Sequence, residues 1–159
     1  MTTKVAINGF GRIGRNIVRA LVETGRDDIQ LVAINDLGPV ETGAHLLRYD
    51  SAHGRFKGDI TVDGNSIDFG LGKIAVSAER DPAALPWGDV DVVLECTGVF
   101  TARDKAAIHL QSGASRVLIS APGADAEKTI VYGVNHDTLT ACLLYTSDAA
   151  DDTPCVDLG

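Results

Sequence analysis

Residues 4–36, KVAINGFGRIGRNIVRALVETGRDDIQLVAIND, decide the fold class. This stretch opens and closes with short apolar runs, 4–8 and 30–35, which are too brief for helices and are bounded as strands are. Between them Ile13, Ile17, Val18 and Leu21 recur at helical spacing, and Gly25 stands where a helix is expected to stop. A strand, a helix and a second strand within so short a stretch predict a right-handed βαβ unit with parallel strands.

The rest of the chain continues this alternation of strands and helices. We expect a short helix over 40–49 and a longer one over 102–111, with Thr101 as N-cap and Asp104 as its capping-box partner. Further apolar or alternating runs predict strands at 59–69 (two, around the turn Asp63-Gly64-Asn65), 73–76, 90–95, 116–120 and 129–133. The predicted fold class is therefore α/β, a Rossmann-type doubly wound domain with a mainly parallel sheet.

The loop after the first strand carries the pattern G-x-G-x-x-G at Gly9, Gly11 and Gly14. A tight turn without a ligand could use the same glycines, but here the pattern follows a strand and opens a helix, as in dinucleotide-binding loops. Gly9 would allow the sharp turn, Gly11 the approach of a pyrophosphate, and Gly14 the packing of helix on strand. The N–H groups of the first helical turn, around Arg12 and Ile13, would then face the phosphates.

Asp36 ends the second predicted strand, about 20 residues after the glycine loop, where a carboxylate accepts hydrogen bonds from the adenosine ribose. Asp36 could also serve as a turn residue, since Asn35-Asp36-Leu37-Gly38-Pro39 is rich in turn formers. A carboxylate at the ribose would repel a 2′-phosphate, so we expect NAD to be preferred over NADP.

Composition excludes several other classes of protein. The chain has 159 residues, a formal net charge of −8 and 45% hydrophobic residues, without an apolar run long enough to span a bilayer. Its acidic balance argues against a nucleic-acid binder. Cys96, Cys142 and Cys155 lack the spacing of metal ligands, so we expect neither a metal site nor a disulfide scaffold. Without a recognisable signal sequence, the expected location is cytoplasmic.

Five motifs resemble those of the glyceraldehyde-3-phosphate dehydrogenase family. They are VAINGFGRIGR (5–15), HLLRYDSAHGRF (45–56), AERDP (78–82), ECTG (95–98) and YGVN (132–135). The resemblance runs from Thr3 to about Ala141 and implies an NAD-binding domain over 1–141. It also implies an intact enzyme, a homotetramer, that oxidises D-glyceraldehyde 3-phosphate, a sugar phosphate, to 1,3-bisphosphoglycerate with NAD and phosphate.

The resemblance also implies roles for individual residues. Arg12 and Ile13 match the pair at the pyrophosphate, and Asp36 matches the ribose acid. Arg80 matches a residue beside the adenine; the alternative is a solvated loop cation. Ser120 matches a hydroxyl near the nicotinamide, or simply caps a strand, while Thr97 and Gly98 close another strand at the same sheet edge.

The nucleophile of this family is missing from the expected place. The family's cysteine lies in a Ser-Cys-Thr-Thr-Asn run after the YGVN strand, and no such run exists here. Neither Cys142 nor Cys155 has the right neighbours, Cys96 lies in a buried-strand pattern, and the family's catalytic histidine belongs to a catalytic α+β domain that we expect to be missing. We therefore assign no catalytic residue, and we expect the 159-residue chain to be inactive.

Residues 142–159 do not match the family pattern, and residues 143–151 within them resemble a translated sequencing adapter, so we expect a disordered or artefactual tail. Two other interpretations stay open. Erythrose-4-phosphate dehydrogenase shares nearly the same opening motif, and the chain could instead be a non-catalytic nucleotide-binding module with a tail of its own.

Overall fold

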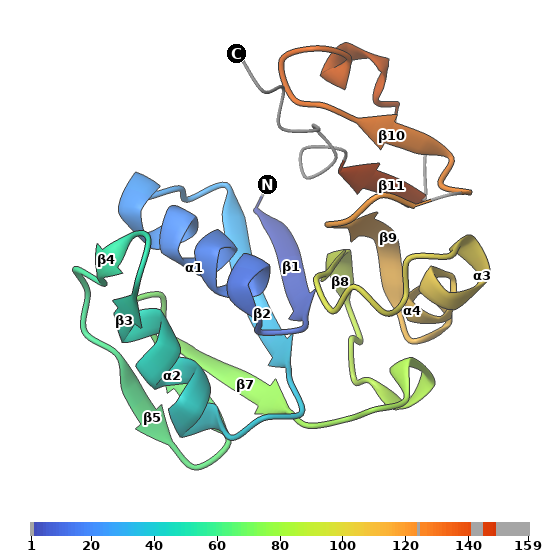
Figure 1. Ribbon diagram of the computed structural model, residues 1–159. Coiled ribbons are helices and arrows are strands. Elements are labelled where there is room, and N and C mark those ends of the chain that lie inside the picture. Colours follow the sequence, from blue (N-terminus) through green and yellow to red (C-terminus); the bar gives the residue numbers. More distant parts are fainter. Residues whose placement is uncertain (1, 124, 141–144, 149–159) are drawn as a thin grey trace.

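The computed structural model describes residues 2–123, 125–140 and 145–148, which form a broad sheet with flanking helices (Figure 1). In chain order the elements are β1 (Thr3–Asn8), α1 (Arg12–Thr24), β2 (Ile29–Asn35), α2 (Val40–Arg48), β3 (Tyr49–Asp50), β4 (Gly54–Arg55), β5 (Thr61–Asp63), β6 (Ser66–Asp68), β7 (Lys73–Ser77), the 3-10 turn η1 (Pro82–Ala84), β8 (Val90–Glu95), α3 (Arg103–Ala106), α4 (Ile108–Gln111), β9 (Ala114–Ile119), β10 (Lys128–Ile130), the 3-10 turn η2 (His136–Thr138) and β11 (Tyr145–Asp148).

Nine strands form one sheet in the order β10-β11-β9-β8-β1-β2-β7-β6-β5, and β3 pairs with β4 separately. Neighbours from β10 to β7 are parallel, while β7/β6 and β6/β5 are antiparallel. The predicted Rossmann-type α/β class is therefore confirmed. The chain first builds outward from β1 through β2 to β7, and then returns to add β8 and β9 on the other side of β1. Open α/β sheets bind ligands where the strand order reverses in this way, here between β1 and β8.

The predicted βαβ unit is present with nearly the predicted boundaries. Strands β1 and β2 are parallel, with Ile7 opposite Ile34, and α1 ends at Gly25 in the left-handed conformation (φ 61°). The short helix expected at 40–49 is α2, and the two strands expected around Gly64 are the hairpin β5/β6.

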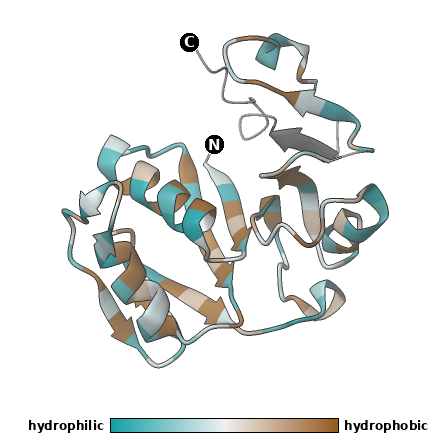
Figure 2. Ribbon diagram, in the orientation of Figure 1, coloured by the Kyte–Doolittle hydropathy of each residue, from teal (hydrophilic) through white to brown (hydrophobic). Residues whose placement is uncertain are grey.

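The two faces of the sheet are covered by different parts of the chain. In β1, the side chain of Ile7 packs with Val18 of α1 and Leu47 of α2, whereas its neighbour Ala6 packs with Trp87 and Val93. All six are almost completely buried. Hydrophobic residues are accordingly frequent along the central strands (Figure 2). This two-sided burial explains why the central strands are apolar runs and do not alternate with polar residues.

The helix expected over 102–111 is not continuous. The structure has two four-residue helices, α3 and α4, joined at Ala107, because the N–H of Leu110 donates to the carbonyl of Ala107, three residues back. Thr101 is not the N-cap either. Ala102 occupies that position, and the N–H of Arg103 donates to the carboxylate of Asp125, 2.9 Å away. A distant acceptor thus replaces the predicted capping box.

The last part of the described chain also differs from expectation. Strand β10 spans Lys128–Ile130, so the strand expected at 129–133 ends before Val131. Residues 145–148 belong to the tail expected to be disordered, but they form β11, which pairs through its backbone with β9 and β10. The rest of that tail lies outside the described residues, and the domain boundary after Ala141 stays a prediction. Within the described ranges, no helix is long and apolar enough to cross a membrane.

Candidate functional site

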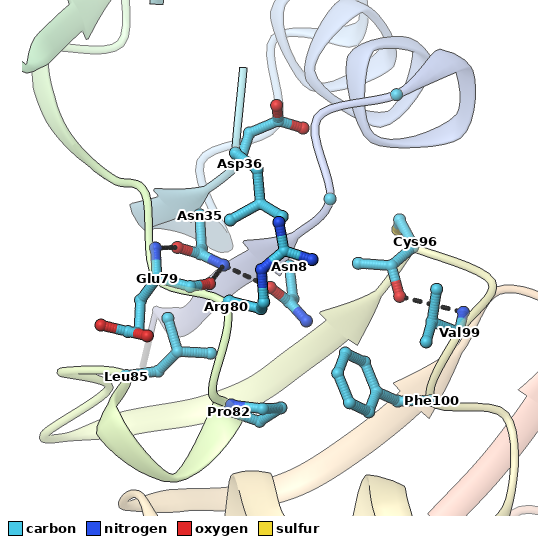
Figure 3. A pocket seen from close by; sticks show the side chains of 14 residues that line it. Asn8, Asn35, Asp36, Glu79, Arg80, Pro82, Leu85, Cys96, Val99 and Phe100 are labelled. Atoms are coloured by element: carbon cyan, nitrogen blue, oxygen red, sulfur yellow. Dashed lines mark hydrogen bonds between the residues drawn. The ribbon is translucent and has the colours of Figure 1, made fainter. Parts of the chain in front are cut away.

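An open pocket of about 340 Å³ lies at the carboxyl edge of the sheet, where β1, β2 and β8 end (Figure 3). Figure 3 shows Asp36 at one side of this pocket, Phe100 at the opposite side and Arg80 between them. The pocket is lined by Asn8, Gly9, Gly11, Asn35, Asp36, Leu37, Glu79, Arg80, Pro82, Leu85, Cys96, Thr97, Val99 and Phe100. It lies at the strand-order reversal, which is the expected ligand position in this class of fold.

The glycine loop brings the start of α1 tightly against the ends of β1 and β8. Gly9 has φ +97°, a conformation that L side chains rarely adopt, and a Cβ there would lie 2.8 Å from the backbone nitrogen of Thr97. A Cβ on Gly14 would collide with the carbonyl oxygen of Gly9 and would lie 3.1 Å from Ile7 Cγ2. Both positions therefore require glycine, as the sequence pattern predicted.

Gly11 differs from these two glycines because its Cβ position is open. Nothing lies within 4 Å of a Cβ built there, its φ of −72° is ordinary, and the residue lines the pocket. Gly11 is also the N-cap of α1, and within the described chain no side chain caps this helix and no acidic residue occupies its first turn. The first turn, which contains Arg12 and Ile13, therefore keeps the free N–H groups and the positive dipole end that bind an anion.

Asp36 follows β2 and lines the same pocket. Its Oδ2 accepts the N–H of Phe10 at 2.6 Å, and its Oδ1 accepts the N–H of Gly38 at 2.8 Å. Asp36 therefore acts as a turn residue and also ties the glycine loop to the end of β2. A carboxylate has about four acceptor sites, so two remain for other donors such as ribose hydroxyls.

Two buried asparagines that sequence reasoning missed hold the pocket together. Asn35 Nδ2 donates to Asn8 Oδ1 and to the carbonyl of Glu79, both at 2.8 Å, and Asn35 Oδ1 accepts from the N–H of Glu79 at 2.8 Å and from the hydroxyl of Ser77 at 2.9 Å. These bonds fix the segment that carries the exposed Arg80 into the pocket (Figure 3). The sequence does contain a signal for these two residues, because an asparagine ends each of the first two apolar runs, 4–8 and 30–35.

The predicted residues at the ends of β8 and β9 are only partly in the pocket. Thr97 lines it, whereas Gly98 and Ser120 are not among its lining residues. The backbone N–H and the hydroxyl of Ser120 both donate to the carbonyl of Glu95, at 3.0 and 3.1 Å, which is the strand-capping arrangement. Arg12, Ile13 and Gly14 likewise lie outside the lining set, and Arg12 Nη1 is 3.7 Å from a carboxylate oxygen of Asp50.

An apolar wall that the sequence did not predict completes the pocket. It consists of Leu37, Pro82, Leu85, Val99 and Phe100. A helix end with free N–H groups, a carboxylate with free acceptor sites and an apolar wall are features that suit the phosphates, ribose and bases of a dinucleotide. The residues present therefore fit the cofactor that we expected.

Cys96 lines the pocket, but its thiol is not activated. Burial is the main cause that raises the pKa of this thiol to about 11; the side chain of Ser120 lowers it and the nearby Glu95 carboxylate raises it, both by less than burial does. A thiol rather than a thiolate is present at neutral pH, and it is a poor nucleophile. Cys142 and Cys155 lie outside the described residues. Among the residues that are described, no cluster of histidine, cysteine, aspartate or glutamate could hold a metal ion.

Comparison with known proteins finds one family, both by family model and by similar relatives. Residues 3–103 match the family model described as the NAD-binding domain of glyceraldehyde 3-phosphate dehydrogenase. The chain is 62% identical over 156 residues to the glyceraldehyde-3-phosphate dehydrogenase of Cereibacter sphaeroides, and 61% identical over 158 residues to that of Xanthobacter flavus. Each alignment covers 98% of this chain, continues past Ala141 and covers 47% of the relative. The chain thus spans about half the length of the curated relatives that it matches.

Proposed function

Because the chain belongs to the glyceraldehyde-3-phosphate dehydrogenase family, we propose that it binds NAD in the pocket at the carboxyl edge of its sheet, as the cofactor-binding half of a phosphorylating dehydrogenase. The observation that carries this proposal is the open space over Gly11, at an uncapped helix end, in the same pocket as the Asp36 carboxylate. A pyrophosphate and a ribose need these two features side by side.

Each predicted residue has a part in this binding mode. Gly9 and Gly14 shape the loop, Gly11 leaves room for the pyrophosphate, and the N–H groups of Arg12 and Ile13 hold it. Asp36 accepts the ribose hydroxyls, and Arg80 lies beside the adenine on the segment held by Asn35. Thr97, Gly98 and Ser120 form the edge toward the nicotinamide. When bound, NAD supplies an acceptor for the hydride removed from the substrate.

For the whole enzyme we propose the oxidation of D-glyceraldehyde 3-phosphate to 1,3-bisphosphoglycerate with phosphate. The names of the relatives support this substrate over erythrose 4-phosphate. We also propose a homotetramer in the cytoplasm for that enzyme. The 159-residue chain by itself should form no NADH, because Cys96 is not an activated nucleophile and the family's cysteine motif is missing from its expected place.

Titration calorimetry of the 159-residue chain with NAD, NADP and ADP-ribose tests the proposal. We expect NAD and ADP-ribose to bind and NADP to bind more weakly, because Asp36 repels the 2′-phosphate. Absence of NAD binding by a folded chain would refute it. Incubation with glyceraldehyde 3-phosphate, phosphate and NAD should leave the absorbance of NADH unchanged. Appearance of NADH would refute the proposed lack of activity.

A further inference from the structure

A hydrogen-bond chain, buried except at Thr97, runs beneath the pocket. We call it the Glu95 network, and it consists of Trp87, His109, Glu95, Asn8 and Thr97. His109 is completely buried, and Glu95 and Asn8 are only 1% and 2% exposed. Glu95 Oε2 accepts from Asn8 Nδ2 at 2.6 Å and lies 2.9 Å from His109 Nε2. Its Oε1 accepts from the backbone N–H of Thr97 at 2.8 Å and from the Thr97 hydroxyl.

The hydrogen-bond chain fixes the protonation of His109. Trp87 Nε1 lies 3.0 Å from His109 Nδ1, and an indole nitrogen can only donate. His109 Nδ1 must therefore accept, which leaves the single proton of a neutral imidazole on Nε2, pointing at Glu95. His109 thus donates to Glu95 without carrying a positive charge.

The other end of the network is fixed in the same way. The backbone N–H of Glu79 can only donate, so Asn35 presents its oxygen to it and its Nδ2 to Asn8 Oδ1. Asn8 then has only its Nδ2 left for Glu95. Main-chain and indole donors at the two ends together orient every group in between.

Glu95 therefore receives four hydrogens and is a carboxylate. A carboxylate satisfies all four donors at once, whereas a protonated Glu95 would have to reverse one of these bonds and donate to the Thr97 hydroxyl. The four donors are all neutral, and the one basic side chain within 4 Å of the Glu95 carboxylate among the described residues is the neutral His109. The four hydrogen bonds stabilise the negative charge of Glu95, but no positively charged side chain described within 4 Å balances it.

This charge lies at the end of the site that the nicotinamide would occupy. Asn8 and Thr97 line the pocket, so the carboxylate is one hydrogen bond below its surface. Glu95 is the last residue of β8, on the opposite side of the glycine loop from Asp36 and β2. If the adenosine ribose lies at Asp36 and the pyrophosphate at α1, the other half of the dinucleotide extends over the end of β8.

We propose that the buried carboxylate of Glu95 makes the pocket select the oxidised over the reduced nicotinamide. This inference rests on the proposed function. The oxidised ring carries one positive charge that the reduced ring lacks. A negative charge held close to the ring by neutral donors, in a medium that screens less than water, therefore stabilises the oxidised form selectively.

The test compares the dissociation constants for NAD and NADH in the wild-type chain and in Glu95→Gln. We expect the wild type to bind NAD more tightly, and the variant to narrow the NADH-to-NAD ratio of dissociation constants by about threefold or more. The glutamine side chain of this variant can point its oxygen at Asn8 and His109 and its amide at the Thr97 hydroxyl, so most of the hydrogen bonds survive. ADP-ribose, which lacks the nicotinamide, should keep its affinity within about twofold.

Asp89→Asn is the matched control, because it removes one carboxylate charge at the other end of β8, away from the pocket. It should leave the ratio unchanged. An unchanged ratio in Glu95→Gln, or an equal change in Asp89→Asn, would overturn the inference. If Glu95→Gln does not fold, the wild-type chain still tests the inference. Equal dissociation constants for NADH and NAD in the wild type would overturn the proposed selectivity. A wild-type chain that binds neither nucleotide, nor ADP-ribose, would overturn the proposed function itself and this inference with it.

Discussion

Substitution of Gly11 by alanine should weaken cofactor binding and leave the stability of the fold nearly unchanged. A Cβ at this position meets no atom within 4 Å, and φ −72°, ψ −158° is accessible to alanine. Loss of glycine's freedom in the unfolded chain stabilises by about 0.4–1 kcal/mol. Alanine is the poorer N-cap by a similar amount, so the free energy of unfolding should change by less than about 1 kcal/mol.

The same methyl group should weaken NAD binding strongly. It would occupy the space over the first turn of α1, where we place the pyrophosphate, and would hold the phosphate oxygens away from the N–H groups of Arg12 and Ile13. A hydrogen bond to a charged group contributes about 1.5–3 kcal/mol. Loss of one such bond corresponds to a dissociation constant about ten- to a hundredfold higher.

Gly25→Ala supplies the opposite control. Gly25 also has open space at its Cβ position, but its φ of +61° costs alanine about 1–2 kcal/mol, and it lies at the far end of α1 from the pocket. Its variant should lose stability and keep its NAD affinity. Calorimetry measures the affinity, and the fluorescence of Trp87, the single tryptophan and buried, follows denaturation by urea. Unchanged NAD binding in Gly11→Ala would refute the placement of the pyrophosphate.

Three further outcomes are expected. Asp36→Ala should narrow the preference for NAD over NADP by about tenfold, since charges ~4 Å apart repel by about 1–4 kcal/mol; an unchanged affinity ratio would exclude the ribose role. Gly14→Ala should lower both the free energy of unfolding, by about 1–3 kcal/mol, and the NAD affinity, because its Cβ collides with the Gly9 carbonyl; full stability in urea would contradict this packing. The N–H groups of Ala52 and His53, each 2.8 Å from Asp50 Oδ1, lower the pKa of Asp50 to about 2. Because the folded pKa is depressed, this carboxylate stabilises the fold above its unfolded pKa near 3.8 and ceases to do so as the pH falls toward 2. Acid unfolding of Asp50→Asn should therefore depend less on pH between about 4 and about 2, and a slope equal to that of the wild type would contradict the assignment.

Local patterns in the sequence were sufficient to predict the first two strands and the helix between them, which lie at the core of the fold. The apolar runs around Ile7 and Ile34, the helical spacing between them and the stop at Gly25 each depend on neighbouring residues only, and all three appear in the structure. The glycine requirement at Gly9 and Gly14 was predictable for the same reason, because a turn from strand to helix imposes it locally.

Contacts between residues that lie far apart in the sequence could not be predicted from these local patterns. Asn8 and Glu95 are bonded across 87 positions, and Trp87 and His109 across 22, so no periodicity could reveal the Glu95 network. The predicted helix breaks at Ala107, and His109 just after the break is bonded to Glu95 and Trp87 outside the helix, contacts that local spacing does not show. The cap at α3 comes from Asp125 rather than from the adjacent Thr101.

A crystal structure of the 159-residue chain with NAD tests the proposed binding mode directly. We expect pyrophosphate oxygens within hydrogen-bond distance of the N–H groups of Arg12 and Ile13, with the adenosine ribose on the Asp36 carboxylate. NAD bound elsewhere, or a ribose that makes no contact with Asp36, would contradict it.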